Sequence, residues 1–127
     1  MENINNKNDC IKKICNLPLD FKVENKSSVN ILLESKFIEF SCVISKHEIK
    51  DYLFLNKKLI DIWKLWSENK RTLGYYLLIN SDKYFMGSID KDGKENFSKS
   101  FITAEDACAE FILREVSTIL NINYTKS

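Results

Sequence analysis

A single histidine is the first residue to consider as a catalytic base or a metal ligand. His47 lies within Ser45-Lys46-His47-Glu48, a pattern typical of the first turn of a helix, where the serine and the glutamate cap the backbone. A functional histidine needs a nucleophile, a carboxylate or further ligands beside it, and the neighbouring sequence offers no such arrangement. We therefore expect His47 to be an exposed helix residue, and we predict no catalytic residue and no enzyme activity for this chain.

The cysteines and one acidic loop are the remaining candidates for redox or metal chemistry. No two cysteines form a CxxC pair or reach the spacing of a zinc site, which favours reduced thiols, with Cys42 and Cys108 as small core residues. Ser88-x-Asp90-x-Asp92-Gly93 resembles part of a calcium loop, but Lys99 stands where a bidentate glutamate is required. The sequence therefore predicts a protein without metal or cofactor, in which Gly93 serves a hairpin turn.

The elements that would carry any site centre on residues 74–101, GYYLLINSDKYFMGSIDKDGKENFSKSF. Tyr75, Leu77 and Ile79 alternate with their neighbours, as expected of a strand that is buried on one side. Residues rich in Asn, Ser, Asp and Gly at 80–83 and 90–93 favour two tight turns. This stretch predicts an antiparallel meander of three strands, which needs helices to cover it.

Two long helices are predicted on either side of the meander, at about residues 46–67 and 104–120. The first follows the capping box and has apolar residues at helical spacing, although the polar stretch Asn56-Lys57-Lys58 could interrupt it. The second begins after Thr103, which is a suitable N-cap, and keeps one continuous apolar face. Small residues near its start would allow it to lie close to the sheet.

The N-terminal region is predicted to contain a short helix followed by strands. Residues 4–16 place apolar side chains at helical spacing, and Pro18 should prevent that helix from running further. Residues 19–24 and 29–44 are rich in Val, Ile and Phe, a composition that favours strands around a polar turn. In the second of these strands, the face with Ile38, Phe40 and Cys42 is expected to be buried.

Length and composition favour one domain over residues 1–127, with a polar tail from about residue 121. A hydrophobic content of 44% and 127 residues are enough to bury a core. We therefore expect an α+β fold, in which an antiparallel sheet from the meander and the N-terminal strands packs against the two long helices. The N-terminus lacks a signal-peptide pattern and no apolar run is long enough to span a membrane, so we expect a cytoplasmic protein.

The charge distribution and the aromatic residues bear on the kind of partner. The formal net charge is +1, without the clustered lysines and arginines of a typical nucleic-acid surface. An alternative function is nonetheless a single-stranded nucleic-acid binding module, because several aromatic residues of the meander could stack on bases. These residues are Tyr75, Tyr76, Tyr84, Phe85 and Phe97. A third possibility is an enzyme whose site is assembled from dispersed residues.

The C-terminal half carries a resemblance to a known family. Residues 70–115 resemble an immunity-protein family of bacterial polymorphic-toxin and contact-dependent growth-inhibition systems. The matching pieces are Lys70-Arg71-Thr72-Leu73-Gly74-Tyr75-Tyr76, Tyr84-Phe85-Met86-Gly87, Ile89-Asp90-Lys91-Asp92-Gly93-Lys94 and Ala104-Glu105-Asp106-Ala107-Cys108. None of the pieces is a catalytic signature, and the first 44 residues add nothing to the resemblance.

This resemblance implies a small cytosolic bacterial protein that binds the toxin domain encoded beside it and blocks its activity. Many such toxin domains cut nucleic acid and have basic clefts, so an inhibitor should offer carboxylates, which this chain concentrates after Gly74. The expected toxin-binding residues are Asp82, Asp90, Asp92, Glu95, Glu105, Asp106 and Glu110. Of these, Asp106 has a second possible role at the start of its helix, and Glu105 and Glu110 are expected to lie off the apolar face.

Overall fold

The computed structural model describes residues 4–69 and 74–122, apart from the side chains of Asn96 and Phe97. The tail residues 123–127 and the start of the resemblance, residues 70–73, lie outside the described residues. The elements follow in the order α1 (Lys7–Cys15), α2 (Leu17–Val23), α3 (Ser28–Glu34), α4 (Phe37–Phe40), α5 (Lys46–Leu55), α6 (Lys58–Asn69), β1 (Gly74–Asn80), β2 (Lys83–Ile89), β3 (Glu95–Phe101) and α7 (Ala104–Ile119).

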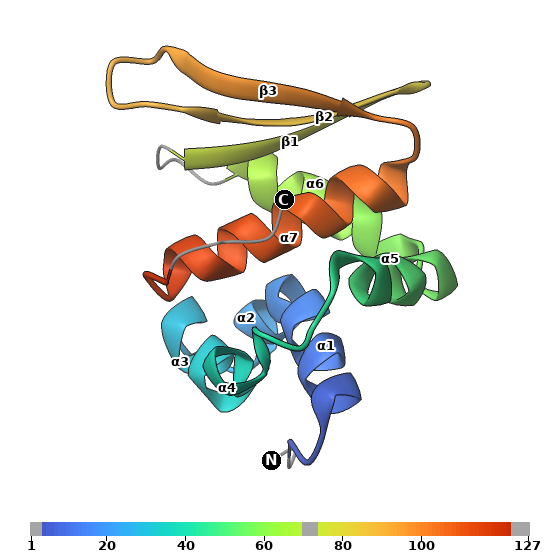
Figure 1. Ribbon diagram of the computed structural model, residues 1–127. Coiled ribbons are helices and arrows are strands. Elements are labelled where there is room, and N and C mark those ends of the chain that lie inside the picture. Colours follow the sequence, from blue (N-terminus) through green and yellow to red (C-terminus); the bar gives the residue numbers. More distant parts are fainter. Residues whose placement is uncertain (1–3, 70–73, 123–127) are drawn as a thin grey trace.

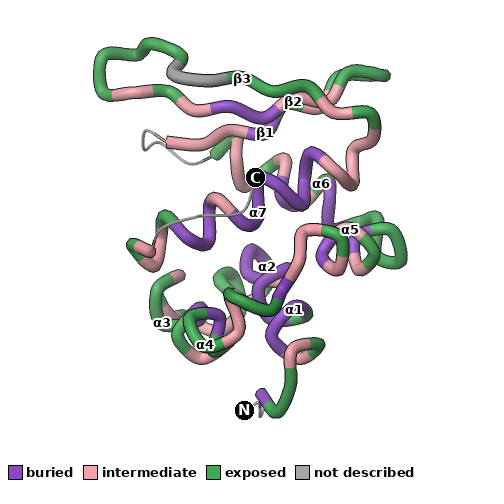
Figure 2. The backbone as a smooth tube through the Cα atoms, in the orientation of Figure 1, coloured by how far each residue is buried: buried purple, intermediate pink, exposed green. Residues whose placement is uncertain are grey.

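These elements stack in layers around α7. The sheet lies above α7 and α6, while α1 to α4 lie on the other side of α7, and α5 packs against its first turns (Figure 1). Helix α7 is therefore enclosed between the sheet and the N-terminal helices. Because the layers meet at α7, its residues from Ala107 to Leu113 are all buried, and buried positions run along it (Figure 2).

The sheet confirms the predicted meander. Its three strands are antiparallel in the order β1-β2-β3, so β2 is central and the other two strands are edges. Leu77 and Met86 are register partners and point into the core, where they are 3% and 0% exposed. Asp90 closes the second turn, since its side-chain oxygen accepts from the backbone N–H groups of Asp92 and Lys94.

The C-terminal helix confirms the prediction for residues 104–120 closely. The Thr103 hydroxyl accepts from the backbone N–H of Asp106, which fixes the start of α7. Cys108, Phe111 and Ile112 are completely buried, as expected for residues on its apolar face. Ser117 is buried as well, because α7 has protein on more than one side.

The prediction of one helix over residues 46–67 is wrong, because the helix is interrupted at Asn56 and two helices form. The capping box is present: the Ser45 hydroxyl accepts from the Glu48 backbone N–H, and the Glu48 carboxylate accepts from the Ser45 N–H. Helix α5 then ends at Leu55, where Asn56 leaves helical geometry and its side-chain amide donates to the Tyr52 carbonyl. Helix α6 continues to Asn69 in a different direction (Figure 1).

The predicted N-terminal strands are also wrong, because residues 19–24 and 29–44 form helical turns. Helix α1 ends before Pro18, as expected. Pro18 itself lies in the first turn of α2, where backbone N–H groups make no hydrogen bond within the helix, so its lack of an N–H costs nothing. Ser27 caps α3 by accepting from the Asn30 N–H, which aligns Ile31 and Leu32 with the core. The Val and Ile content favoured strands, but burial against α1 and α7 outweighs this propensity.

The expected burial is wrong for Ile38 and Cys42 for the same reason, whereas Phe40 is partly buried against the core. Phe37 is 2% exposed whereas Ile38 and Val43 are 48% and 58% exposed, so burial does not alternate along this segment as it would in a strand. Lys36 adopts a left-handed conformation (φ 61°) immediately before the single turn of α4, so the alternation of a strand does not apply. Of the two cysteines that were expected in the core, Cys108 is buried and Cys42 is exposed.

We expect Gly93→Val to lower the free energy of unfolding by about 1–2 kcal/mol. Gly93 has φ +78°, and a Cβ added to it would meet nothing within 4 Å, so the loss comes from the backbone alone. Gly93→Asn should lose less, because asparagine tolerates positive φ. Denaturant unfolding checks both variants, and equal midpoints for Gly93→Val and wild type would contradict the turn assignment.

Candidate functional site

The most extensive candidate site is the outer sheet face, the side of the sheet that faces away from α7. No element among the described residues packs on this side (Figure 1). Leu78 is 43% exposed there, Ile89 is 37% exposed, and Phe85 is half-buried beside Leu78 as its register partner. The face as a whole comprises Tyr76, Leu78, Phe85, Gly87, Ile89, Glu95, Ser98 and Ser100.

The side chain of Tyr76 spans the middle of this face from β1 to β3. The Tyr76 hydroxyl on β1 donates to the Glu95 carboxylate on β3, at 2.6 Å. To reach it, the side chain passes over β2 at Gly87, its register partner, which is buried although it lies on the exposed side. Burial and the Glu95 carboxylate both raise the Tyr76 pKa, so the phenol remains a neutral donor. The face is thus an apolar platform with a carboxylate at one end.

The predicted acidic residues do not form one patch. Asp90, Asp92 and Glu95 lie together at the end of the sheet formed by the β2–β3 turn, whereas Asp82 lies in the β1–β2 turn at the opposite end (Figure 1). The Asp90 side chain accepts hydrogen bonds from the backbone of the turn, and the Glu95 carboxylate accepts one from the Tyr76 hydroxyl. Four lysines in residues 74–101 balance the four acids there, so these strands carry no net negative charge.

The acids of α7 occupy different surroundings from one another. Glu105 is half-buried in the first turn. The Asp106 carboxylate lies 3.0 Å from the Lys46 Nζ and 3.9 Å from the Lys50 Nζ, so it ties α7 to α5. Asp106 therefore serves the packing of two helices in addition to its place in the first turn.

The expectation that Glu110 lies off the buried face is wrong. Glu110 is 1% exposed, and its Oε2 accepts from the Arg114 Nε at 2.5 Å. The Lys46 Nζ lies 3.6 Å from its Oε1, which has no hydrogen-bond partner among the described residues. The Arg114 guanidinium also lies over the Tyr75 ring at 5.6 Å. Glu110 is thus an internal anchor between α7, α5 and β1, and cannot contact a partner protein.

An apolar groove between α2 and α6 was not anticipated from the sequence. It has a volume of about 390 Å³ and is lined by Pro18, Phe21, Lys22, Ile62, Leu65, Trp66 and Asn69. The Phe21 and Trp66 rings meet edge to face at 5.6 Å, and the Trp66 indole N–H donates to the Glu115 carboxylate. Ile62 and Leu65 lie off the apolar stripe of the helix predicted for residues 46–67, which was a signal for a second apolar surface. The strand predicted for residues 19–24 prevented us from placing Phe21 opposite them.

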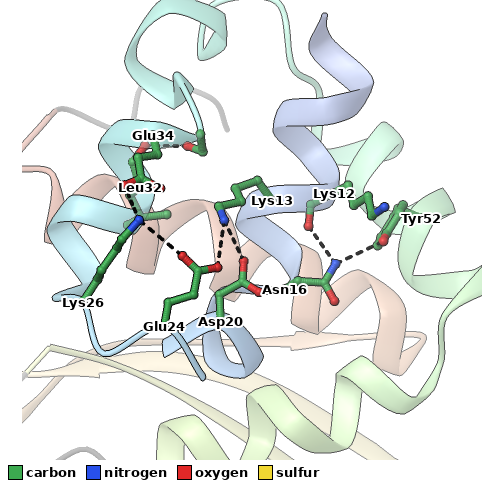
Figure 3. Close-up of polar contacts among 10 residues, drawn as sticks. Lys12, Lys13, Asn16, Asp20, Glu24, Lys26, Leu32, Glu34 and Tyr52 are labelled. Atoms are coloured by element: carbon green, nitrogen blue, oxygen red, sulfur yellow. Dashed lines mark hydrogen bonds and ion pairs between the residues drawn. The ribbon is translucent and has the colours of Figure 1, made fainter. Parts of the chain in front are cut away.

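A polar pocket of about 610 Å³ lies between α1, α2 and α3. Lys13 is 6% exposed, and its Nζ lies 3.1 Å from Asp20 and 3.2 Å from Glu24 (Figure 3). Lys26 extends this network of alternating positive and negative charges, because its Nζ pairs with Glu24 and, at 2.7 Å, with Glu34. These charges satisfy one another, so the pocket ties the N-terminal helices together rather than offering unpaired groups.

The residues considered for catalysis lie apart. His47 is exposed, and its Nε2 lies 3.4 Å from the Asp51 carboxylate one helical turn away. Burial raises the pKa of Cys10 to about 12 and raises the pKa values of Cys15 and Cys108 as well, which keeps these thiols protonated. Among the described residues, no three His, Cys, Asp or Glu side chains form a group that could hold a metal ion.

The aromatic residues of the meander are divided between the two faces. Tyr75 and Tyr84 pack against the core, so only Tyr76 and Phe85 lie on the outer face, and the Phe97 side chain is outside the described residues. The Tyr76 hydroxyl already donates to the Glu95 carboxylate, and this negative charge would repel a phosphate. This arrangement disfavours base stacking along the sheet.

We expect the polar pocket to make stability depend on pH in a defined direction. Hydrogen bonding from Lys13 lowers the Glu24 pKa below its ordinary 4.5, so its contribution is present above that pH and is lost as pH falls through the lowered value. Burial alone would lower the Lys13 pKa, but its bonds to Asp20 and Glu24 raise it above 10.5. That contribution is present below pH 10.5 and is lost as pH rises through the raised value.

Lys13→Met should therefore reduce the acid sensitivity of the protein. We expect a loss of about 1–2 kcal/mol at pH 7, since the carboxylates left behind can still reach water. Below pH 4.5 the difference from wild type should shrink. Lys22→Met, on the exposed side of α2, is the control. Parallel acid unfolding curves for wild type and Lys13→Met would contradict the role of the ion network.

Charge reversal should distinguish the two glutamates of α7. Glu110→Lys places an ammonium beside Arg114 and Lys46 in a buried site, so we expect a loss of about 3–5 kcal/mol. Glu105→Lys should change stability by only about 0.5 kcal/mol. Chemical denaturation of both variants measures this, and a stable Glu110→Lys protein would show that the buried anchor is not needed.

Comparisons of this chain with known proteins identify no relative. No protein-family model, curated protein or solved structure matches this chain. Among the described residues, no helix is both long enough and apolar enough to cross a membrane.

Proposed function

We propose that this chain is an immunity protein, which binds a bacterial toxin domain encoded beside it and neutralises that domain by stoichiometric inhibition. The observation that carries the proposal is the outer sheet face, an exposed apolar surface on a well-packed scaffold. The resemblance of residues 70–115 to toxin-immunity proteins supplies the class of partner. On this proposal the protein acts in the cytoplasm, has no catalytic residue and needs no cofactor.

The composition of the outer sheet face supports a protein partner. Leu78 and Phe85 supply an apolar centre, and Tyr76 adds a large side chain whose hydroxyl is already satisfied. Polar groups border this centre, including Glu95 and the exposed Asp92. Apolar centres with polar rims and aromatic residues are the usual composition of protein interfaces. Asp82, Asp90 and Glu105 lie outside this centre, and on this proposal they contact basic groups of the toxin domain locally, since the sheet carries no net negative charge to attract it over a long range.

A nucleic-acid partner is the alternative, and the charges weigh against it. The four lysines of residues 74–101 are matched by four acids, which gives no cationic track for a phosphate backbone. Retention on a single-stranded oligonucleotide with steep salt dependence would favour this alternative over the immunity proposal.

Leu78→Asp should weaken binding to the toxin domain by at least about tenfold, because it places a carboxylate in the apolar centre. Leu55→Asp is the matched control, since Leu55 is 80% exposed at the end of α5, away from the sheet. Calorimetric titration of the toxin domain into wild type and both variants provides the affinities and the stoichiometry.

We expect one molecule of this chain per toxin domain, with Leu55→Asp binding like wild type. No binding by wild type would refute the immunity proposal. Equal affinities for all three proteins would retain the proposal but move the interface away from the outer sheet face, with the groove between α2 and α6 as the next surface to test.

A further inference from the structure

The two edges of the sheet differ in how their backbone groups are satisfied. On β1, the backbone N–H of Leu77 donates to the Ser67 hydroxyl of α6 at 2.8 Å, so a side chain of α6 lies against this edge and satisfies one of its outward groups. On β3, Ser98, Lys99 and Ser100 are all exposed, and β2 is the one strand that pairs with β3 among residues 4–69 and 74–122. An exposed edge strand is a template for pairing with a further strand.

The register shows which β3 groups point outwards. The N–H of Leu77 points away from β2, so Leu77 and Met86 form a non-hydrogen-bonded pair. The backbone groups of Met86 must then point towards β3, where Lys99 is its register partner. Directions alternate along a strand, so the N–H and C=O groups of Ser98 and Ser100 point away from the sheet.

Lys99 gives this edge a charge preference. Its Nζ lies 5.2 Å from the centre of the Phe101 ring, and the Lys46 Nζ lies 5.4 Å from the same ring. Lys46 is already paired with Asp106, whereas Lys99 forms no ion pair within the part of the chain that the structure describes. A strand added beside β3 would gain most if it placed a carboxylate next to Lys99.

We infer that the β3 edge accepts an extended segment of the toxin domain, which extends the sheet by one strand and places an acidic side chain against Lys99. This inference rests on the proposed function. The small side chains of Ser98 and Ser100 lie on the outer sheet face, so a strand at this edge is continuous with a partner seated on Leu78 and Phe85. Backbone pairing sets the register of the toxin segment, and Lys99 selects its charge.

Ser100→Pro removes one outward N–H and leaves the pairing between β3 and β2 intact, because proline is tolerated where an edge strand faces solvent. We expect unchanged far-ultraviolet circular dichroism and an affinity for the toxin domain reduced by at least about tenfold, since one donor is lost and the ring obstructs the added strand. Ser100→Ala keeps the N–H and should bind like wild type. Both are measured by calorimetry with the purified toxin domain.

Lys99→Glu tests the charge preference in the same titration. We expect weaker binding whose difference from wild type shrinks at high salt. Lys91→Glu, at the exposed tip of the β2–β3 turn, is the control for a general change of charge. Wild-type affinity for both Ser100→Pro and Lys99→Glu would overturn the inference and leave the proposed function standing. A wild-type protein that binds no toxin domain would overturn both.

Amide hydrogen exchange keeps the inference testable if Ser100→Pro fails to fold. In the wild-type complex the Ser98 and Ser100 amides should exchange more slowly than in the free protein, while the Leu77 amide, already bonded to Ser67, should change little. Unchanged exchange at Ser98 and Ser100 would overturn the inference. Slow exchange of both amides in the free protein, together with a dimeric mass, would assign the edge to a second copy of this chain and overturn it as well.

Discussion

The enclosure of α7 on two sides is the constraint on which the rest of this structure depends. The sheet covers one side of the helix and the N-terminal helices cover the other, so even Glu110 and Glu115 are buried on it. Each carboxylate has a partner there: Arg114 and Lys46 lie beside Glu110, and the Trp66 indole N–H donates to Glu115. Removing one partner of such a group leaves a buried charge, which is strongly destabilising. The three layers are therefore held together by interactions that meet at α7.

Trp63 connects these layers through α6. Its side chain is fully buried, its indole N–H donates to the Cys15 carbonyl of α1, and its ring meets Phe111 of α7 edge to face at 6.0 Å. The sheet covers α7 with one face, and no element among the described residues packs on its other face (Figure 1). The same arrangement that stabilises the core leaves the outer sheet face available to a partner.

Much of the chain from Ser45 onwards could be predicted because its signals are local. The capping residues Ser45 and Thr103 start helices, and the Asp90 turn closes the second hairpin. In residues 1–44 the cap at Ser27 was interpreted as part of a turn, because the Val and Ile content suggested strands. Short helices form there because Ile31, Leu32 and Phe37 are buried against other helices. The site was predicted less well. A helix with one apolar face places Glu110 in solvent, and only tertiary structure reveals that α7 is covered on both sides.

The central claim is that this chain neutralises a toxin domain by binding it, and cell growth tests this most directly. Bacteria that produce the toxin domain encoded beside this chain should stop growing, and co-production of the wild-type chain should restore growth. Its protective effect should require at least one molecule per toxin molecule, as expected of a stoichiometric inhibitor rather than an enzyme. Growth arrest that persists with this chain present in excess and correctly folded would contradict the claim.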